Sequence, residues 1–200
     1  SPLAALKVQT DVAQLSLDDP EAQSKALGQL HAGIDRASRL VDQLLTLSRL
    51  DSLDNLDDVE PVMMADLLQS AVLDIWHPAQ QAGIDIRLNV NAPEVMRHGQ
   101  PLLLSLLARN LLDNAVRYSP RGSVVDVTLN TQSFTVRDNG PGISTDALAR
   151  LGERFYRPPG QDATGSGLGL SIVKRIAALH GMRASLGNAP EGGFEVTVSW

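Results

Sequence analysis

The sequence has no cysteine, no excess of basic residues and no long apolar run. Without cysteine the chain can form neither disulfides nor thiolate metal sites, which fits a reducing compartment. Its formal net charge of -6 argues against a general nucleic-acid binder, because such proteins normally carry a basic face. No run of about 18 apolar residues occurs, so no segment is expected to span a membrane.

The chain also lacks an initiating methionine and a secretion signal, and begins Ser1-Pro2-Leu3. We therefore expect it to be a piece of a longer protein, whose membrane anchor would lie before Ser1. Its 200 residues are enough for one full domain and a smaller unit. The hydrophobic share of 43% is typical of a globular protein.

The first part of the chain predicts two helices. Apolar and small residues recur every three or four positions over residues 3–17, and Asp18-Asp19-Pro20 then marks a stop, a helix cap and a proline start. The next helix keeps heptad spacing at Leu27, Leu30, Ile34, Ala37, Val41 and Leu44. An antiparallel hairpin of this kind buries its apolar stripe poorly, which favours a four-helix dimer. The alternative is that the helices pack on the rest of the chain.

The acidic stretch 51–61 ends in proline and predicts a linker between two domains, residues 1–54 and 55–200. The second part mixes periodicities of helix and strand. Helices are predicted over 64–83, with Pro78 ending or kinking the first, over 102–118 and over 171–180. Strands are predicted over 84–90, 125–129, 134–136, 183–186 and 194–199. The fold class is therefore α+β, a two-layer α/β sandwich with a largely antiparallel sheet, preceded by the helical hairpin.

Two glycine clusters carry most of the functional signal. Asp138-Asn139-Gly140-Pro141-Gly142 follows a strand, and an ionised Asp138 could accept the exocyclic amino group of adenine. The same residues also suit an ordinary turn. The second cluster, Gly165-Ser166-Gly167-Leu168-Gly169-Leu170, opens onto a helix N-terminus, where free N–H groups attract phosphate. It follows a loop and lacks Gly-Lys-Ser/Thr, so it is neither a dinucleotide fingerprint nor a P-loop.

Asn110 and Asn114 lie at i and i+4 of one predicted helix, so both amides face one way. Amide oxygens are hard ligands that suit Mg²⁺ when phosphates and water complete its octahedron. A helix cap and a hydrogen-bonded core amide explain the pair equally well. Arg117 and Tyr118 follow one turn later, where they could offer a phosphate contact and an aromatic face.

Four ordered motifs resemble the N, G1, F and G2 boxes of bacterial sensor histidine kinases. They are Asn110-Leu-Leu-Asp-Asn114, Asp138-Asn-Gly-Pro-Gly142, Glu153-Arg-Phe-Tyr-Arg157 and Gly165-Ser-Gly-Leu-Gly169-Leu. Ser1-Pro2-Leu3 resembles the tail of the family's H box. The resemblance covers essentially the whole chain, and within the family it is greatest to the quorum-sensing sensor kinases of enterobacteria.

The resemblance implies an ATP site of the Bergerat (GHKL) type. It assigns adenine binding to Asp138, Mg²⁺ and phosphate to Asn110 and Asn114, and phosphate and base contacts to Arg117 and Tyr118. It assigns positioning of the lid and phosphate to Arg154 and Phe155. The residues assigned to the hinges and lining of the lid are Gly140, Gly142, Gly165, Gly167, Leu168, Gly169 and Leu170. Phosphoryl transfer depends mainly on positioning and charge neutralisation, so Asn110, Asn114, Arg117 and Arg154 are the expected catalytic residues.

The resemblance further implies a protein-histidine kinase of a two-component system. Such a kinase acts as a homodimer at the inner membrane, with its catalytic part in the cytoplasm, and its partner is a response-regulator receiver domain. The acceptor histidine of the family lies before the position of Ser1, and none of His31, His77, His98 and His180 stands in its pattern. We therefore expect this chain not to phosphorylate itself. The alternatives are a non-catalytic, ATP-gated dimerisation module, a related GHKL ATPase, and a pure dimerisation scaffold.

Overall fold

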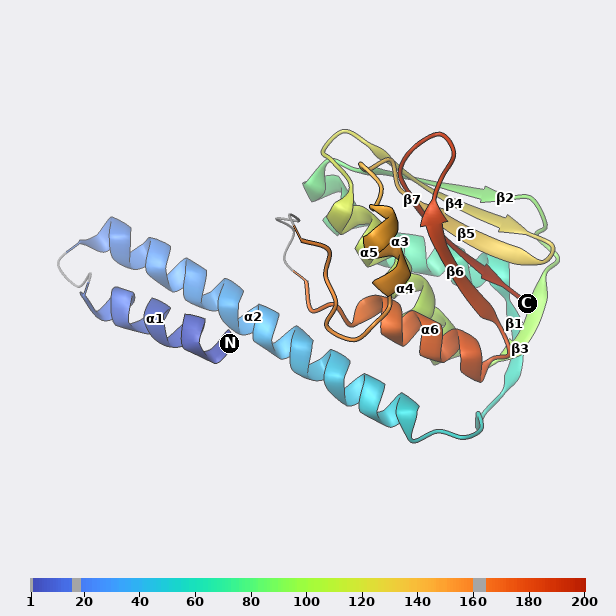
Figure 1. Ribbon diagram of the computed structural model, residues 1–200, viewed down its shortest axis with the longest axis horizontal. Helices are drawn as coiled ribbons and strands as arrows, with labels where there is room; N and C mark the ends of the chain where they lie inside the picture. Colours follow the sequence, from blue (N-terminus) through green and yellow to red (C-terminus); the bar gives the residue numbers. More distant parts are fainter. Residues whose placement is uncertain (1, 16–18, 160–164) are drawn as a thin grey trace. The chain divides into compact units, whose positions relative to one another are not determined.

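The computed structural model describes residues 2–15, 19–159 and 165–200. The chain divides into two compact units, one up to Ser48 and one from Arg49 to Trp200 (Figure 1). The helix that crosses this division ends at Asp51, inside the second unit. The predicted domain boundary after residue 54 stays a prediction.

The first unit is a pair of helices, α1 (Pro2–Leu15) and the first part of α2 (Pro20–Asp51). The carboxylate of Asp19 caps α2 by accepting the N–H groups of Glu21 at 3.1 Å and Ala22 at 3.0 Å. Asp18, the other acidic residue of the predicted turn, lies outside the described residues. The two helices approach at Gly33, where an added Cβ would lie 2.7 Å from Cδ2 of Leu6.

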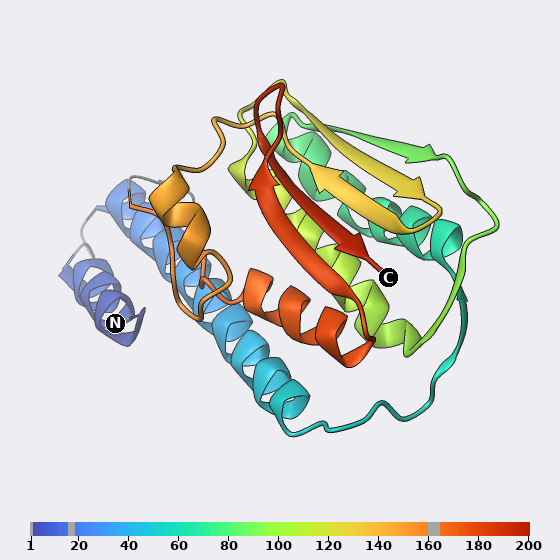
Figure 2. The ribbon, with the colours of Figure 1, turned by 45° about the vertical axis from the view of Figure 1, so that its right-hand side comes forward.

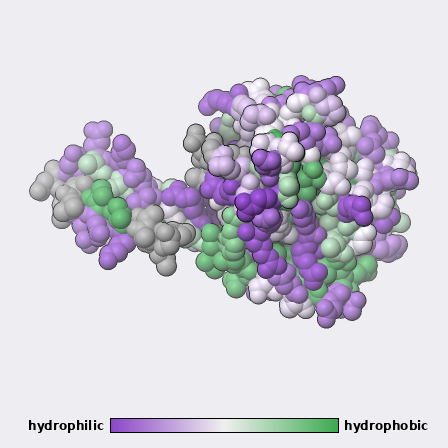
Figure 3. Space-filling view, viewed as in Figure 1, coloured by the Kyte–Doolittle hydropathy of each residue, from purple (hydrophilic) through white to green (hydrophobic). Residues whose placement is uncertain are grey.

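The heptad stripe of α2 is only partly covered, because Leu30 and Ala37 are half-buried while its other positions are exposed. Leu27, Ile34 and Val41, which follow one another at intervals of seven, are all exposed, whereas Ala26 and Gly33 beside them are buried. Figure 3 shows a further apolar patch on this hairpin, over α1, where Val8 and Val12 are exposed. The stripe is therefore open to a partner.

The second unit contains a five-stranded sheet in the order β2-β4-β5-β7-β6. Only β2 and β4 run parallel, and the other three pairings are antiparallel, as the sequence predicted. The strands are β2 (Asp85–Val90), β4 (Val124–Asn130), β5 (Ser133–Arg137), β6 (Arg183–Asn188) and β7 (Phe194–Ser199).

Three helices form the second layer and cover one face of this sheet (Figures 1 and 2). They are α3 (Met64–Ala82), α4 (Pro101–Tyr118) and α6 (Gly169–Leu179). Along β4 every second residue is buried, which puts Val125, Val127 and Leu129 in the core. The helices fill the core with Leu68, Leu107, Leu111, Leu112, Ile172 and Ile176. The α+β sandwich is therefore the observed fold, with α4 between α3 and α6.

The structure adds three short elements that the sequence did not predict. The strands β1 (Glu60–Met63) and β3 (Met96–Gly99) pair antiparallel in a small second sheet, and α5 (Thr145–Arg150) follows the first glycine cluster. Pro61 therefore lies in a strand rather than at the end of a linker. It is tolerated because a two-stranded sheet has only edge strands.

Pro78 does not end α3, contrary to one of the two predicted outcomes. The helix continues to Ala82 and stops at Gly83, whose left-handed φ of 71° suits glycine. A proline inside a helix costs about 3 kcal/mol. Burial of Ile75 and Ala79, on either side of Pro78, offsets this cost. No helix in the described part of the chain is long and apolar enough to cross a membrane.

Candidate nucleotide-binding site

The middle of α4 meets the start of α6 at the two predicted amides. Asn110 is only 8% exposed, and its Nδ2 donates a hydrogen bond of 2.8 Å to the carbonyl oxygen of Leu106 one turn back. A Cβ added at Gly169 would lie 3.3 Å from Oδ1 of Asn110 and 3.4 Å from Oδ1 of Asn114. Because Nδ2 of Asn110 is occupied, its oxygen faces the beginning of α6.

Asp138 lies directly after β5 and is 4% exposed. Its Oδ1 accepts the backbone N–H groups of Gly140 at 2.8 Å and Phe194 at 3.0 Å. Burial raises the pKa of this carboxyl, while the two backbone N–H groups and nearby Arg137 act in the opposite direction. Among the described residues no group donates to Oδ2, which leaves one acceptor for a ligand.

The turn after Asp138 packs against the end of α4. A Cβ added at Gly140 would lie 2.9 Å from Oδ1 of Asp138 and 3.2 Å from the carbonyl oxygen of Tyr118. Gly142 has a φ of 73°, a conformation that side-chain-bearing residues rarely adopt. The first glycine cluster therefore allows a close approach between the carboxylate and α4.

The second glycine cluster lies against the same helix. A Cβ added at Gly165 would lie 3.0 Å from the Tyr118 hydroxyl and 3.7 Å from Nη1 of Arg117. Leu168 is fully buried and anchors the start of α6, whereas Leu170 is partly exposed. Among the described residues no side chain caps this helix end, whose first N–H groups remain suited to an anion. Residues 160–164, part of the predicted lid, lie outside the described residues.

The predicted F-box residues contact the second cluster through the backbone. The N–H of Phe155 donates to the carbonyl oxygen of Gly167 at 3.1 Å, and a Cβ at Gly167 would meet Phe155 Cα at 2.9 Å. Phe155 itself has a φ of 63°, a strained conformation for a residue with a side chain. On the neighbouring turn, Nζ of Lys174 donates to the carbonyl oxygen of Leu151 at 2.7 Å. These contacts hold residues 151–155 against α6 and against the glycine cluster that precedes it.

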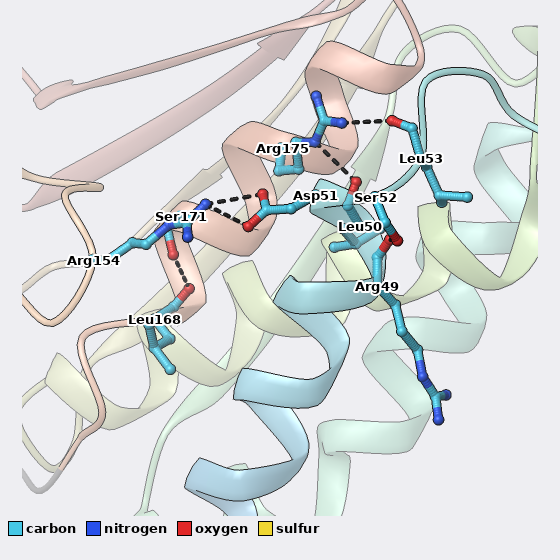
Figure 4. A network of polar contacts seen from close by, with 9 residues as sticks. All are labelled: Arg49, Leu50, Asp51, Ser52, Leu53, Arg154, Leu168, Ser171 and Arg175. Carbon is cyan, nitrogen blue, oxygen red and sulfur yellow. Dashed lines mark hydrogen bonds and ion pairs between the residues drawn. The ribbon is translucent and has the colours of Figure 1, made fainter.

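Arg154 has a partner that the sequence did not predict. Its Nη2 donates to both carboxylate oxygens of Asp51, at 2.9 and 2.7 Å, as Figure 4 shows. In the same network Arg175 of α6 donates to the carbonyl oxygens of Leu50 at 3.1 Å and Leu53 at 2.6 Å. The two arginines thus hold the C-terminal end of α2, where unpaired carbonyl groups favour cations.

His180 joins the far ends of two site helices. Its Nδ1–H donates to the carbonyl oxygen of Ile176 at 2.8 Å, and its Nε2 accepts the N–H of Gln100, the residue before α4, at 3.1 Å. The second bond requires a neutral ring. Burial lowers the pKa of His180, which outweighs the opposite effect of Ile176. The end of a helix favours a cation, but here burial and the Gln100 bond favour the neutral form.

The arrangement fits a magnesium–nucleotide complex. It combines a buried carboxylate with a spare acceptor, the two amides of Asn110 and Asn114 facing Gly169, a glycine cradle that a Cβ would fill, and an uncapped helix N-terminus. In the described part of the chain no group of three or more His, Cys, Asp and Glu residues could hold a metal ion by itself. A hard cation at this site would therefore depend on ligand phosphates as well as on Asn110 and Asn114.

Comparison with known proteins agrees with this geometry. The sequence profile described as histidine kinase-, DNA gyrase B-, and HSP90-like ATPase matches residues 99–200. The chain is 74% identical over its 200 residues to the sensor protein QseC of Salmonella typhimurium strain LT2. It spans 44% of the length of that relative.

Two solved structures support the fold assignment. The cytoplasmic segment of histidine kinase QseC is similar with a TM-score of 0.62 and 62% sequence identity, covering 84% of this chain and 93% of that one. Full-length ShkA, solved in complex with AMPPNP, is similar with a TM-score of 0.74 and 26% identity, covering 98% of this chain and 44% of that one.

Proposed function

The chain belongs to the family of histidine kinase-, DNA gyrase B- and HSP90-like ATPases, and from this premise we propose that it binds ATP with Mg²⁺ as the catalytic part of a sensor histidine kinase. The observation that carries the proposal is the close approach of α4 and α6, since a Cβ built on Gly169 would lie within 3.4 Å of the side-chain amides of both Asn110 and Asn114. At the C-terminal end of α4, a Cβ built on Gly140 would lie 2.9 Å from Oδ1 of Asp138 and 3.2 Å from the Tyr118 carbonyl oxygen. A purine and its phosphates need these two ends at once.

In this proposal the residues bind and orient, and do no covalent chemistry. Oδ2 of Asp138 accepts the adenine amino group, and Asn110 and Asn114 hold Mg²⁺ through their amide oxygens. The N–H groups that begin α6 receive phosphate, with Arg117 and Tyr118 beside Gly165. Mg²⁺ neutralises phosphate charge when it is bound. Arg154, held by Asp51, acts on the position of the lid segment through its neighbour Phe155.

For the whole protein we propose transfer of the γ-phosphate to a histidine of the helical hairpin and then to an aspartate of a response-regulator receiver domain. The similarity to sensor protein QseC and to histidine kinases of known structure supports this role. The open stripe at Leu27, Ile34 and Val41 supports a homodimer through the hairpin. The whole protein would then be a membrane-anchored sensor, and this part of it would lie in the cytoplasm.

ATP hydrolysis, with water as the phosphate acceptor, is the weaker alternative. A general base must accept a proton, and the amide of Asn110, whose nitrogen is bonded to Leu106, has no basic group to do so. A non-catalytic, ATP-gated dimerisation module would also keep the site, and would differ only in transferring no phosphate.

Calorimetry with Mg²⁺-ATP tests the proposal. We expect saturable binding by the chain and a loss of affinity of at least about tenfold in Asp138→Asn, because the amide offers a donor where adenine also donates. Asn91→Ala, which removes a hydrogen bond to Asn130 elsewhere on the sheet, is the matched control. Equal binding by the wild type and Asp138→Asn would contradict the adenine site. Rapid hydrolysis by the chain alone would favour the ATPase.

A further inference from the structure

The β6–β7 hairpin grips the first glycine cluster at its far end through one side chain. Asn188, the last residue of β6, accepts the N–H of Ile143 through Oδ1 at 2.8 Å. Its Nδ2 donates to the carbonyl oxygen of the same residue at 2.7 Å. A single amide therefore satisfies both backbone groups of Ile143, as a paired strand would. A Cβ at Gly142 would lie 3.0 Å from Oδ1 of Asn188, so this contact also needs glycine there.

The same hairpin grips the near end of the cluster. The N–H of Phe194, the first residue of β7, donates to Oδ1 of Asp138 at 3.0 Å. The N–H of Asp138 in turn donates to the carbonyl oxygen of Phe194 at 2.9 Å. Asn188 and Phe194 are themselves register partners in the β6–β7 pairing. Both ends of the turn 139–142 are thus tied to one pair of facing residues.

Arg137 braces the tip of the hairpin from β5. Its Nη1 lies 3.2 Å from the Glu191 carboxylate, and its Nη2 donates to the carbonyl oxygen of Gly192 at 3.2 Å. Glu191 is almost fully exposed, so the hydrogen bond from the guanidinium to the Gly192 carbonyl oxygen is the more dependable part of the brace. The hairpin is therefore fastened to the strand that leads into Asp138.

We propose that Asn188 is a positioning residue for the adenine end of the site, an inference that rests on the proposed function. It acts by holding the turn 139–142 in the conformation that presents Asp138 and Gly140 to the base. It touches no ligand atom in this role. Because the turn is fixed before the ligand arrives, binding does not have to order it.

The hydrogen bonds of Asn188 are exposed, which makes this a role in affinity rather than in the stability of the core. Without them, Gly140 and Gly142 leave the turn free to sample many conformations. We expect Asn188→Ala to raise the Kd of ADP about tenfold, the ratio that corresponds to roughly one lost hydrogen bond. Asn188→Asp keeps the acceptor for the Ile143 N–H but sets a carboxylate oxygen against the Ile143 carbonyl oxygen in place of the donor, so its Kd for ADP should rise at least as much as that of Asn188→Ala.

The experiment compares wild type, Asn188→Ala, Asn188→Asp and Asn91→Ala. Asn91 donates an equally exposed side-chain hydrogen bond of 2.9 Å to Asn130 and serves as the matched control. Calorimetry gives the Kd of ADP, thermal unfolding gives Tm, and amide hydrogen exchange followed by NMR reports the Ile143 N–H directly. We expect Ile143 exchange to accelerate in Asn188→Ala while the exchange of buried Val127 on β4 stays slow.

Weaker ADP binding in both Asn188 variants, with the Tm of Asn188→Ala changed no more than that of Asn91→Ala, supports the inference. Unchanged ADP affinity in Asn188→Ala overturns it and leaves the proposed function standing. Unchanged exchange at Ile143 also overturns it, because the grip would then be absent in solution. A wild-type chain that binds no ADP contradicts the proposed function, and the positioning role falls with it.

Discussion

Arg154 and Asp51, 103 positions apart in the chain, form an ion pair in which one guanidinium nitrogen contacts both carboxylate oxygens. Asp51 is the last residue of α2, and Arg154 precedes Phe155, whose N–H holds the carbonyl oxygen of Gly167. The pair therefore links the end of a long helix to the segment beside the second glycine cluster. Its side chains are 53% and 36% exposed.

A double-mutant cycle with Arg154→Ala and Asp51→Ala should give a coupling of about 0.2–1 kcal/mol in the free energy of unfolding. The value is small because water screens half-exposed charges. Urea unfolding at low and high salt measures it, and the coupling should shrink as salt rises. Purely additive effects at low salt would show that the pair contributes nothing to stability.

At neutral pH, Asp138 is expected to lower the free energy of unfolding of the nucleotide-free chain. Its pKa is raised by burial, so the folded state prefers the protonated carboxyl. That stabilisation is present below the unfolded-state pKa of 3.8 and is lost as pH rises through the raised folded-state pKa. Asp138→Asn, which keeps an oxygen for Gly140 and Phe194, should therefore unfold at an equal or higher Tm at pH 7. A Tm well below wild type at that pH would contradict the sign.

His180 should make stability rise with pH on the acid side of neutrality. Its pKa is lowered from 6.5 by burial, so the folded state prefers the neutral ring that accepts the Gln100 N–H. The stabilisation is complete above pH 6.5 and is lost as pH falls toward the lowered folded-state pKa. Urea unfolding across this window should show a smaller pH slope in His180→Ala than in wild type. His77→Ala, which removes an exposed imidazole, controls for the loss of a histidine.

Gly169→Ala should separate binding from stability. The added methyl would lie between 3.2 and 3.4 Å from the amides of Asn110 and Asn114, in the space proposed for Mg²⁺ and phosphate. We expect the Kd of Mg²⁺-ATP to rise about tenfold or more with little loss of Tm. Gly28→Ala in α2 is the control, because its Cβ would meet no atom within 4 Å. It should gain about 0.5–1 kcal/mol of stability and bind ATP normally. Normal ATP binding by Gly169→Ala would remove the cradle from the proposed site.

The open stripe of α2 can be tested by a single charge. Ile34→Glu places a carboxylate in the middle of the exposed heptad positions and should lower the association constant by about tenfold or more. Analytical ultracentrifugation measures the effect. Leu73→Glu, a change at a still more exposed apolar residue of α3, should leave association unchanged. Dimers that survive Ile34→Glu intact would place the interface elsewhere.

The long periodic elements were predictable because burial imposes a repeat that local sequence records. The alternation over Val125, Val127 and Leu129 and the apolar helix that carries Asn110 both show this. The strands β1 and β3 have four residues each, too few to display a period. The predicted helix over 64–83 is confirmed, and only the expectation that Pro78 could end it was wrong, because the local rule against proline ignores the buried residues packed around it.

The candidate site was predictable only as far as motifs reach. Asn110, Asn114, Asp138 and Gly169 stand in ordered motifs, and the structure places them around α4. The predicted helix 171–180 ends at His180, but the hydrogen bond of this residue to Gln100 spans 80 positions. Asn188 acts on Ile143 across 45 positions. A local sequence pattern carries no information about a side chain that forms a hydrogen bond with a backbone group so far away in the chain. The heptad pattern likewise gave the apolar positions of α2 but not which face α1 covers.

The two hydrogen bonds between Asp138 and Phe194 set an order of events during synthesis. A chain made from its N-terminus has α4 and the first glycine cluster long before β7 exists. Until β7 is synthesised, the Asp138 carboxylate lacks one of its two hydrogen-bond donors, and the turn 139–142 lacks the strand that supports it. A nascent chain should therefore not bind nucleotide until Phe194 has been synthesised and paired with Asp138. Retention on an ATP resin would then mark the moment at which this unit finishes folding.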